Sequence, residues 1–386
     1  MTAHKKATSN RRTNARSAKS AQDLRAQVGQ LLIIGFDGTE MSPALRSLLA
    51  RIQPAGVILF ARNISSAQQT HRLLKDCQAA VDVPLFRCVD LEGGLVDRFR
   101  NVLGSAPSPA DAFATGHRKL FRKHGRILGE NCRALGFNVD FAPAVDLAFE
   151  ASRPVMRSRA VSEDPQAVIN YAREFLAGLR EADVLGSGKH FPGLGEGKLD
   201  SHHELPVIHK SWKALWEQDL VPYRVLKQQF TFVMVSHAAY PEVTGEPTPA
   251  SLSRKWITDI LRKKIGFRGL IASDDLEMGG VLSAGPIEQA SVEHVRAGGD
   301  LCLLCHLEDG IVRSYEQLIR EAESDRRFAQ RVADSSRRTL AFKKRQRDLA
   351  QLLAAPTDAK TARLRRQLWE FAEELRLATI VRQETA

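Results

Sequence analysis

Residues 31–36, Leu-Leu-Ile-Ile-Gly-Phe, form a short apolar run without polar alternation, which is typical of a strand buried on both faces. Seven further runs share this pattern, at 56–60, 85–90, 138–142, 184–190, 231–237, 269–274 and 300–305. Amphipathic stretches that predict helices lie between them, at 41–52, 65–80, 112–135, 164–182, 210–228, 251–265 and 285–297.

Eight alternations of strand and helix predict an α/β fold with a parallel sheet closed into a (β/α)8 barrel of the TIM type. An open, doubly wound sheet is the alternative. No Gly-x-Gly-x-x-Gly follows any of the runs, which weakens a dinucleotide-binding version of that alternative.

The 386 residues divide by composition into three parts. We expect a single barrel domain over 23–310 and a charge-rich helical extension over 311–386, interrupted at Pro356 and packed on the barrel. Residues 1–22 are expected to be a disordered tail. The first twenty residues hold six of the basic side chains and no acidic one, against a net charge of +11 for the chain. A weak nucleic-acid or anionic-surface contact is the alternative reading of that tail, and nucleic acid is otherwise not expected as a partner.

Hydropathy predicts no membrane segment, because the apolar runs are strand-sized and a spanning helix needs about 18 apolar residues. The pair Arg11-Arg12 is not followed by a hydrophobic region of signal-peptide length, so a cytoplasmic location is expected. The protein is expected to be a monomer.

The five cysteines are an odd and sparse set, which argues against a disulfide framework. Residues 302–306, Cys-Leu-Leu-Cys-His, spell the pattern of haem attachment. They lie in a run that reads as a buried strand, where residues three apart point to opposite faces. We therefore predict a core strand here and no cofactor.

Polar residues stand where five of the predicted strands end. These residues are Asp90, Asp146, Lys189-His190, His237 and Asp274-Asp275. In a barrel of this type the active site lies at the carboxyl ends of the strands. Carboxylates and bases gathered there indicate a site that binds a polar ligand and transfers protons.

The stretch after the fifth run, 188–203, is rich in glycine and histidine. Its glycines predict a mobile loop. Asp200 and His202 are two residues apart, and a carboxylate that orients an imidazole suits general acid–base catalysis near neutral pH. A metal site is the competing interpretation, with ligands drawn from His190, Asp200, His202, His203 and His237. No His-Glu-x-x-His or similar spacing supports it, so no metal is expected.

Several motifs in this order resemble the β-N-acetylhexosaminidase branch of glycoside hydrolase family 3. The similarity covers roughly residues 28–310. The motifs are Lys189–Gly193 (KHFPG) followed by Asp200-Ser201-His202, Asp90-x-Glu92-Gly93-Gly94-x-Val96-x-Arg98, Arg159 with Asp164-Pro165, Ser273-Asp274-Asp275, Phe60–Asn63 (FARN) and Phe141-Ala142-Pro143.

The resemblance implies a retaining double displacement on a terminal β-linked N-acetylglucosamine. It makes Asp274 the nucleophile and His202, paired with Asp200, the general acid/base. It also implies that Asp90, Arg98, Arg159, Lys189 and His190 bind the sugar hydroxyls. In bacteria, single-domain members typically release N-acetylglucosamine from muropeptide fragments during cell-wall recycling, so a small carbohydrate is the expected partner.

Three positions depart from the family pattern: Leu95 stands where an arginine is usual, Leu194 where a second histidine is, and Glu196 where an aspartate is common. Asp275 and Glu92 are predicted to be structural neighbours of the site, and no role is assigned to Glu277. The alternatives are a family 3 β-glucosidase, a phosphorolytic glycosidase and a non-catalytic sugar-binding protein. The first usually takes its acid/base from a later domain, which is not expected in a chain of this length.

Overall fold

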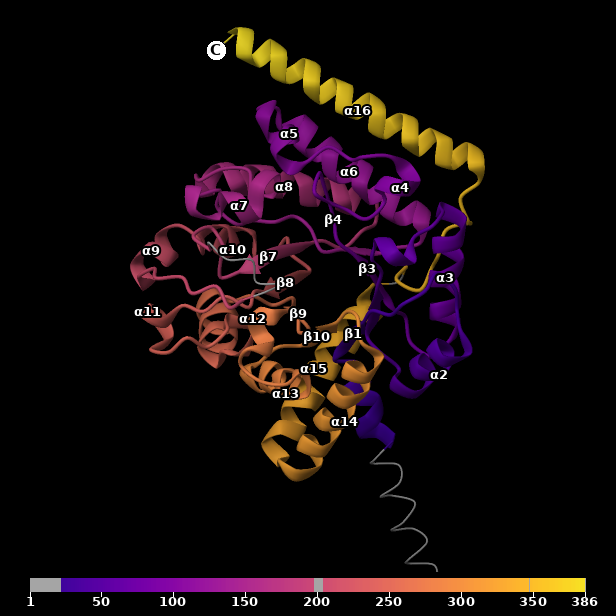
Figure 1. Ribbon diagram of the computed structural model, residues 1–386, viewed down its shortest axis with the longest axis vertical. Coiled ribbons are helices and arrows are strands. Elements are labelled where there is room, and N and C mark those ends of the chain that lie inside the picture. The colour runs from indigo at the N-terminus through magenta and orange to yellow at the C-terminus, as the bar shows by residue number, and fades with distance from the viewer. Residues whose placement is uncertain (1–21, 198–203, 347, 386) are drawn as a thin grey trace, which may run out of the picture.

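The computed structural model describes residues 22–197, 204–346 and 348–385. Its centre is an eight-stranded parallel sheet in the order β6-β3-β2-β1-β10-β9-β8-β7 (Figure 1). The strands are β1 (Leu32–Ile34), β2 (Gly56–Ile58), β3 (Phe86–Val89), β6 (Val139–Asp140), β7 (Ser187–Phe191), β8 (Phe232–Val235), β9 (Leu270–Asp275) and β10 (Leu301–Leu304). Each lies on one of the eight apolar runs, so the strand prediction is confirmed.

The sheet closes on itself between β6 and β7. Parallel bridges pair Val139 with Leu185 and Ala144 with Lys189, and the amide of Val145 donates to the carbonyl oxygen of Lys189 at 2.7 Å. This closure confirms the barrel and excludes the open, doubly wound sheet.

Helices surround the barrel as the amphipathic pattern predicts. They are α2 (Pro43–Ile52), α3 (Ala67–Ala79), α4 (Arg100–Leu103), α5 (Pro109–Ala114), α6 (Arg118–Leu135), α7 (Arg153–Met156), α8 (Pro165–Glu181), α9 (Trp212–Glu217), α10 (Val221–Leu226), α11 (Pro241–Thr244), the π-helix η5 (Lys255–Ile265), α12 (Gly279–Leu282), α13 (Ile287–Ala297), α14 (Glu308–Ser324), α15 (Arg326–Arg345) and α16 (Asp358–Thr385).

Two predicted helices are interrupted. The stretch 112–135 breaks between α5 and α6 at Gly116, whose φ of 71° lies in the left-handed region that favours glycine. The stretch 210–228 breaks between α9 and α10. A short antiparallel hairpin, β4 (Leu91–Gly93) with β5 (Val96–Asp97), was not predicted, and it follows β3 directly at the carboxyl end of the barrel.

The barrel interior is a packed aromatic and aliphatic core. Phe232 stands edge-on to Phe86 and Phe141, with ring centroids 5.3 and 5.6 Å apart. Cys305 belongs to this interior cluster, whereas Cys302 belongs to the layer between strands and helices. The two sulfurs therefore lie on opposite faces of the β10 strand, as predicted. All five cysteines are buried and free.

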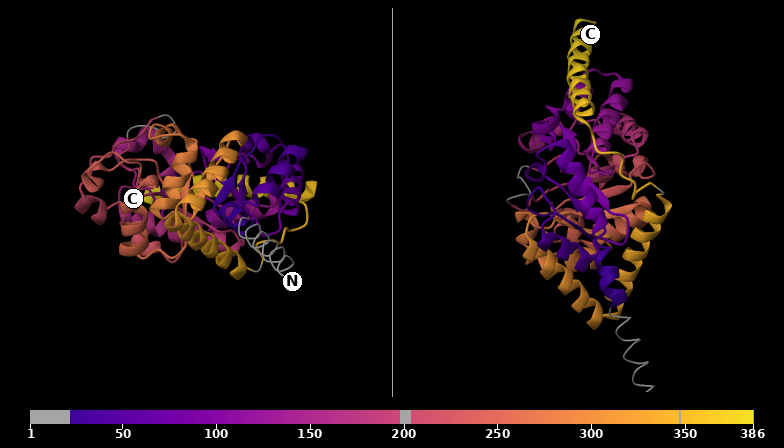
Figure 2. Two further views of the ribbon diagram at one scale, coloured as in Figure 1. Left: turned by 90° about the horizontal axis from the view of Figure 1, so that it is seen from below. Right: turned by 90° about the vertical axis from the view of Figure 1, so that its right-hand side faces the viewer.

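The C-terminal helices pack on the barrel. Phe342 and Lys343 of α15 reach the amino-terminal end of the interior, where the Lys343 ammonium donates to the Gln30 amide oxygen at 2.9 Å. The last helix, α16, lies beside α4, α5 and α6 on the outside of the molecule (Figures 1 and 2). It buries Leu364, Leu368 and Phe371 there.

The domain limits at residues 22 and 310 stay predictions, and the basic tail up to residue 21 lies outside the described residues. No helix in the described part of the chain is long and apolar enough to cross a membrane.

Candidate active site

Lys189 joins two acidic residues at the carboxyl end of the barrel. Its ammonium lies 2.8 Å from Asp90 Oδ1 and 2.7 Å from Glu92 Oε1. Asp90 follows β3, Glu92 lies in β4, and Lys189 lies in β7, so three elements meet at one cation. The Lys189 side chain is buried, and two charge-assisted bonds compensate for its loss of hydration.

Glu92 links this lysine to Arg159. The guanidinium of Arg159 forms a bidentate pair with Glu92, both bonds measuring 2.8 Å. Burial alone would raise the pKa of Glu92, but the charges of Arg159 and Lys189 hold it well below its usual range. Glu92 was predicted only to be a structural neighbour. It is the carboxylate that fixes two of the predicted sugar-binding residues.

His190 is held from both sides of its ring. Its Nδ1 lies 2.7 Å from Asp146 Oδ2, and its Nε2 lies 3.3 Å from an Arg159 Nη2 atom. Asp146 also accepts the backbone amides of His190 and Leu194. The buried carboxylate therefore fixes both the ring orientation and the start of the glycine-rich loop. In this way Leu194, which replaces a family histidine, is buried and well anchored.

Asp274 lies next to the last residue of β9 and faces this network of paired charges. Burial alone would raise its pKa, but interactions with the side chains of His190, His237 and Lys189 and with the backbone amide of Asp275 outweigh burial and lower it. The Asp275 amide donates to Asp274 Oδ1 at 2.9 Å. Asp274 is therefore a partly buried carboxylate whose surroundings favour its ionised form.

Asp275 and Glu277 shape the loops beside Asp274. Asp275 Oδ1 accepts the Glu277 amide at 3.0 Å, and its backbone oxygen lies 2.8 Å from His237 Nε2. Glu277 accepts the backbone amides of Cys305, His306 and Leu307, which begin the loop after β10. Glu277 had no predicted role, and the structure makes it the residue that fixes this loop.

Arg98 lies next to Phe60, with its guanidinium carbon 5.5 Å from the ring centroid. Its buried Nε has no hydrogen-bond partner among the described residues. Leu95, which stands where the family has an arginine, is half exposed at the turn of the β4–β5 hairpin.

The predicted acid/base pair, Asp200 and His202, lies outside the described residues, as does His203. Described residues before and after this stretch form ion pairs with one another. Glu196 Oε1 lies 3.1 Å from the ammonium of Lys210, and the same ammonium lies 2.7 Å from the buried Asp219. Thus Glu196, the third departure from the family pattern, has a definite partner.

Two of the candidate ligands for the competing metal site, His190 and His237, already have hydrogen-bond partners on both ring nitrogens. Both ring nitrogens of His190 face protein partners, and those of His237 face Ser251 Oγ at 2.7 Å and the Asp275 carbonyl oxygen. An imidazole ligand needs a free nitrogen that points at the metal. Neither side chain offers one in this arrangement.

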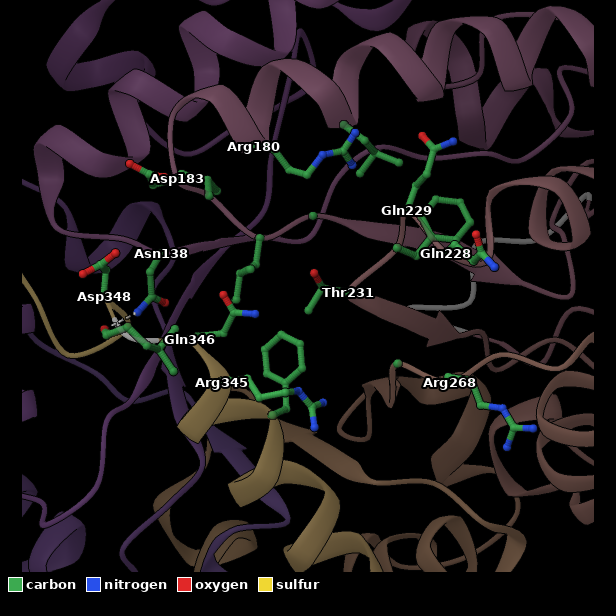
Figure 3. A pocket seen from close by; sticks show the side chains of 18 of the residues that line it. Asn138, Arg180, Asp183, Gln228, Gln229, Thr231, Arg268, Arg345, Gln346 and Asp348 are labelled. Atoms are coloured by element: carbon green, nitrogen blue, oxygen red, sulfur yellow. Dashed lines mark hydrogen bonds between the residues drawn. The ribbon is translucent and has the colours of Figure 1, made fainter.

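A large cavity of about 770 Å³ lies at the other end of the barrel. Figure 3 shows residues that precede the strands, such as Asn138 and Thr231, together with Arg180, Arg268 and Arg345 from the surrounding helices and loops. In barrels of this type residues at the amino-terminal face serve stability. The catalytic residues are therefore expected at the opposite end, where Asp274 lies.

Comparison with known proteins identifies the class. Residues 23–342 match the glycosyl hydrolase family 3 N terminal domain. A β-hexosaminidase of Idiomarina loihiensis is 34% identical over 305 residues, which are 78% of this chain and 91% of that protein. The chain therefore belongs to glycosyl hydrolase family 3, and it is a glycoside hydrolase.

Two solved structures are similar over most of the chain. A family 3 β-N-acetylglucosaminidase from Paenibacillus sp. str. FPU-7 is 31% identical with a TM-score of 0.83, covering 90% of this chain and 68% of that one. A β-N-acetylhexosaminidase from Beutenbergia cavernae is 26% identical with a TM-score of 0.76, and the match covers 83% of this chain and 98% of that one. The family resemblance and the barrel fold expected from sequence are confirmed.

Proposed function

We propose that this protein is a retaining exo-β-N-acetylhexosaminidase that removes terminal β-linked N-acetylglucosamine. The observation that carries the proposal is the position of the Asp274 carboxylate near the end of β9, at the same end of the barrel as the paired charges of Lys189, Asp90 and Glu92. The names of the similar proteins, β-hexosaminidase and β-N-acetylglucosaminidase, support the same substrate class.

The network suits a sugar ring. Hydroxyl groups surround the ring, and charged donors and acceptors such as Lys189 and Asp90 form strong hydrogen bonds with them. Because Glu92 and Asp146 already fix Arg159 and His190, these side chains are positioned before the sugar arrives. Preorganised polar groups contribute to catalysis without reorganising during the reaction.

In the proposed mechanism the Asp274 carboxylate attacks the anomeric carbon and forms a covalent glycosyl-enzyme. The transition state resembles an oxocarbenium ion, which the anionic carboxylate stabilises. His202, oriented and kept charged by Asp200, protonates the departing oxygen. In the second step the same imidazole removes a proton from water, which releases the sugar with retained configuration.

The natural substrate we propose is a muropeptide fragment of peptidoglycan, cleaved in the cytoplasm by a monomeric enzyme. Strong selectivity for the acetamido sugar is part of the proposal, because a pocket built for that group leaves polar atoms unpaired when glucose binds. We expect a preference of at least about 100-fold for N-acetylglucosaminide over glucoside, on the order of 3 kcal/mol. Comparable rates on both would favour a β-glucosidase.

The test compares two variants with an activated substrate, a dinitrophenyl N-acetylglucosaminide. Asp274→Asn should lose several orders of magnitude of activity with every leaving group. His202→Ala should still form the glycosyl-enzyme, because dinitrophenolate departs without protonation, and should then hydrolyse it slowly. A burst followed by a slow steady state is expected, with one sugar mass added to the peptide that contains Asp274.

Two results would contradict these roles. One is an equal loss on natural and activated substrates in His202→Ala, and the other is a label on a different carboxylate. Asp200→Asn should resemble His202→Ala in a milder form. The product of a muropeptide digest made with and without phosphate separates hydrolysis, which yields the free sugar, from phosphorolysis, which yields the sugar 1-phosphate.

A further inference from the structure

Lys210, a buried lysine just before α9, lies between two carboxylates. Its ammonium is 2.7 Å from Asp219 Oδ2 and 3.1 Å from Glu196 Oε1. It also lies over the ring of Phe149, 4.4 Å from the centroid. Asp219 is buried as well, whereas Glu196 is partly exposed. A buried ammonium is stable only beside groups that replace its water, so these partners hold the lysine in one position.

The two carboxylates belong to separate parts of the chain. Glu196 lies in the turn that follows β7, and Asp219 lies between α9 and α10. The ion pairs therefore connect the two ends of the segment that runs from Glu196 to Lys210. The predicted acid/base pair, Asp200 and His202, occurs within this segment of the sequence and lies outside the described residues.

The first end of this segment has further contacts. The Tyr240 hydroxyl donates to the Gly193 carbonyl oxygen at 2.6 Å, and Asp146 accepts the Leu194 amide at 2.7 Å. Gly193 has a φ of 142°, and a Cβ atom on it would lie only 2.9 Å from the Cβ of Asp219. The Asp219 side chain therefore packs against the start of the glycine-rich loop and also pairs with the ammonium.

The second end is fixed by backbone pairing to the loop after β8. The Ile208 amide donates to the Ala239 carbonyl oxygen, and the Ala239 amide donates to the Pro206 carbonyl oxygen, both at 2.8 Å. Ser211 then caps α9, where its hydroxyl oxygen accepts the Ala214 amide at 3.2 Å. The lysine between these two anchors therefore extends from a fixed stretch of backbone.

Asp219 is ionised at neutral pH in spite of its burial. Burial raises the pKa of Asp219 to about 6, and Lys210 acts against that rise. The carboxylate that holds the ammonium is therefore charged in the pH range where an imidazole acid/base works.

Holding both ends of a segment together removes conformations from it. Less entropy is then lost when the segment adopts the one arrangement that reacts. Resting on the proposed function, we infer that Lys210 is a positioning residue for proton transfer to the leaving group. By pairing with Glu196 and Asp219, it restricts the segment that carries the acid/base. Since Lys210 transfers no proton itself, its loss should slow the step that needs a proton and leave sugar binding intact.

The experiment compares two substrates that differ in their need for that proton. The disaccharide of β-1,4-linked N-acetylglucosamine has a leaving group that must be protonated. Dinitrophenyl N-acetylglucosaminide releases dinitrophenolate, which departs without protonation. For both substrates kcat/KM reports the steps up to formation of the glycosyl-enzyme, so the comparison isolates the role of the acid.

Three variants of the full chain change the cluster in different ways. Lys210→Met removes the charge and keeps most of the length, and Lys210→Arg keeps the charge. Glu196→Gln weakens only the link to the first end, because the pair of Lys210 with Asp219 remains. The matched control is Lys213→Met, at an exposed lysine on α9.

We expect Lys210→Met to lower kcat/KM at least about tenfold on the disaccharide and less than about threefold on the dinitrophenyl substrate, mainly through kcat. Glu196→Gln should lower it about threefold on the disaccharide and leave the dinitrophenyl substrate unaffected. Lys210→Arg should stay within about threefold of the wild type on both, and Lys213→Met should match the wild type.

Equal losses on the two substrates in Lys210→Met and Glu196→Gln would mean that the cluster only supports the fold, and the positioning role would be wrong. If Lys210→Met does not fold, Glu196→Gln decides by the same comparison, because its side chain is partly exposed. His202→Ala is measured in parallel. If it shows no dependence on the leaving group, the proposed acid/base fails and this inference falls with it. A dependence seen in His202→Ala alone refutes only the role of Lys210.

Discussion

Removing the charge of Glu92 is the sharpest test of how the site is held together. The change is Glu92→Gln, which keeps the shape of the side chain. In the native protein this carboxylate is fully buried and receives three short bonds, two from Arg159 and one from Lys189. Neutralising it leaves Arg159 without its anionic partner in a site shielded from water.

The size of the effect follows from burial. Breaking a buried ion pair by removing one partner costs about 3–5 kcal/mol, because the other charge stays buried and uncompensated. Glutamine retains one acceptor, and Lys189 keeps its bond to Asp90, so the lower end is expected, about 3 kcal/mol of unfolding free energy. The same variant should lose at least about tenfold in kcat/KM, or roughly 1.4 kcal/mol, since Arg159 and Lys189 lose their fixed positions.

Urea denaturation followed by tryptophan fluorescence measures the first quantity, and steady-state kinetics on an N-acetylglucosaminide measures the second. The matched control is Glu150→Gln, the same chemical change in an exposed pair with Arg153, where the side chain is 78% accessible. Exposed pairs of this kind contribute at most about 1 kcal/mol. If Glu92→Gln and Glu150→Gln shift unfolding by similar small amounts, Glu92 does not organise the site.

Two further predictions concern the fold, and a third concerns the basic tail. Burial lowers the pKa of Lys343 to about 7, so between pH 7 and 10 the unfolded chain binds the proton that the folded one releases, and stability rises with pH. Lys343→Met should remove on the order of 2 kcal/mol of the rise in unfolding free energy between pH 7 and 9. The plot of melting temperature against pH should therefore be flatter for this variant. Lys344→Met, a control at an exposed lysine, should keep the wild-type slope. Phe232→Ala should cost about 3–5 kcal/mol of unfolding free energy, because it leaves a cavity in the barrel interior. The control Leu377→Ala, at an exposed residue, should cost less than about 0.5 kcal/mol. A loss under about 1 kcal/mol for Phe232→Ala would mean that neighbouring side chains fill the cavity. Deleting residues 1–20 should leave kcat/KM on a small neutral substrate within about threefold, under 1 kcal/mol, and a tenfold loss would show that the tail reaches the site.

The sequence by itself determined the barrel. Each of the eight apolar runs forms a strand. Burial on both faces requires consecutive apolar residues, and such a run can be recognised within a few positions of the sequence. The same local rule placed Cys302 and Cys305 on opposite faces of β10. It also placed Asp90, Lys189, His190 and Asp274 at strand ends, since turn residues follow strands within a few positions.

Only the tertiary structure decided which charges meet. Glu92 and Arg159 are 67 residues apart and Lys189 and Asp90 are 99 apart, so no local pattern predicts their pairing. The same holds for Glu277, which reaches backbone amides about thirty residues later, and for the stacking of His306 on Phe60. Periodicity specifies which face of an element is buried, because neighbouring residues share that element. Pairing across the barrel depends on how distant elements close on one another, which is set by the packing of the whole chain.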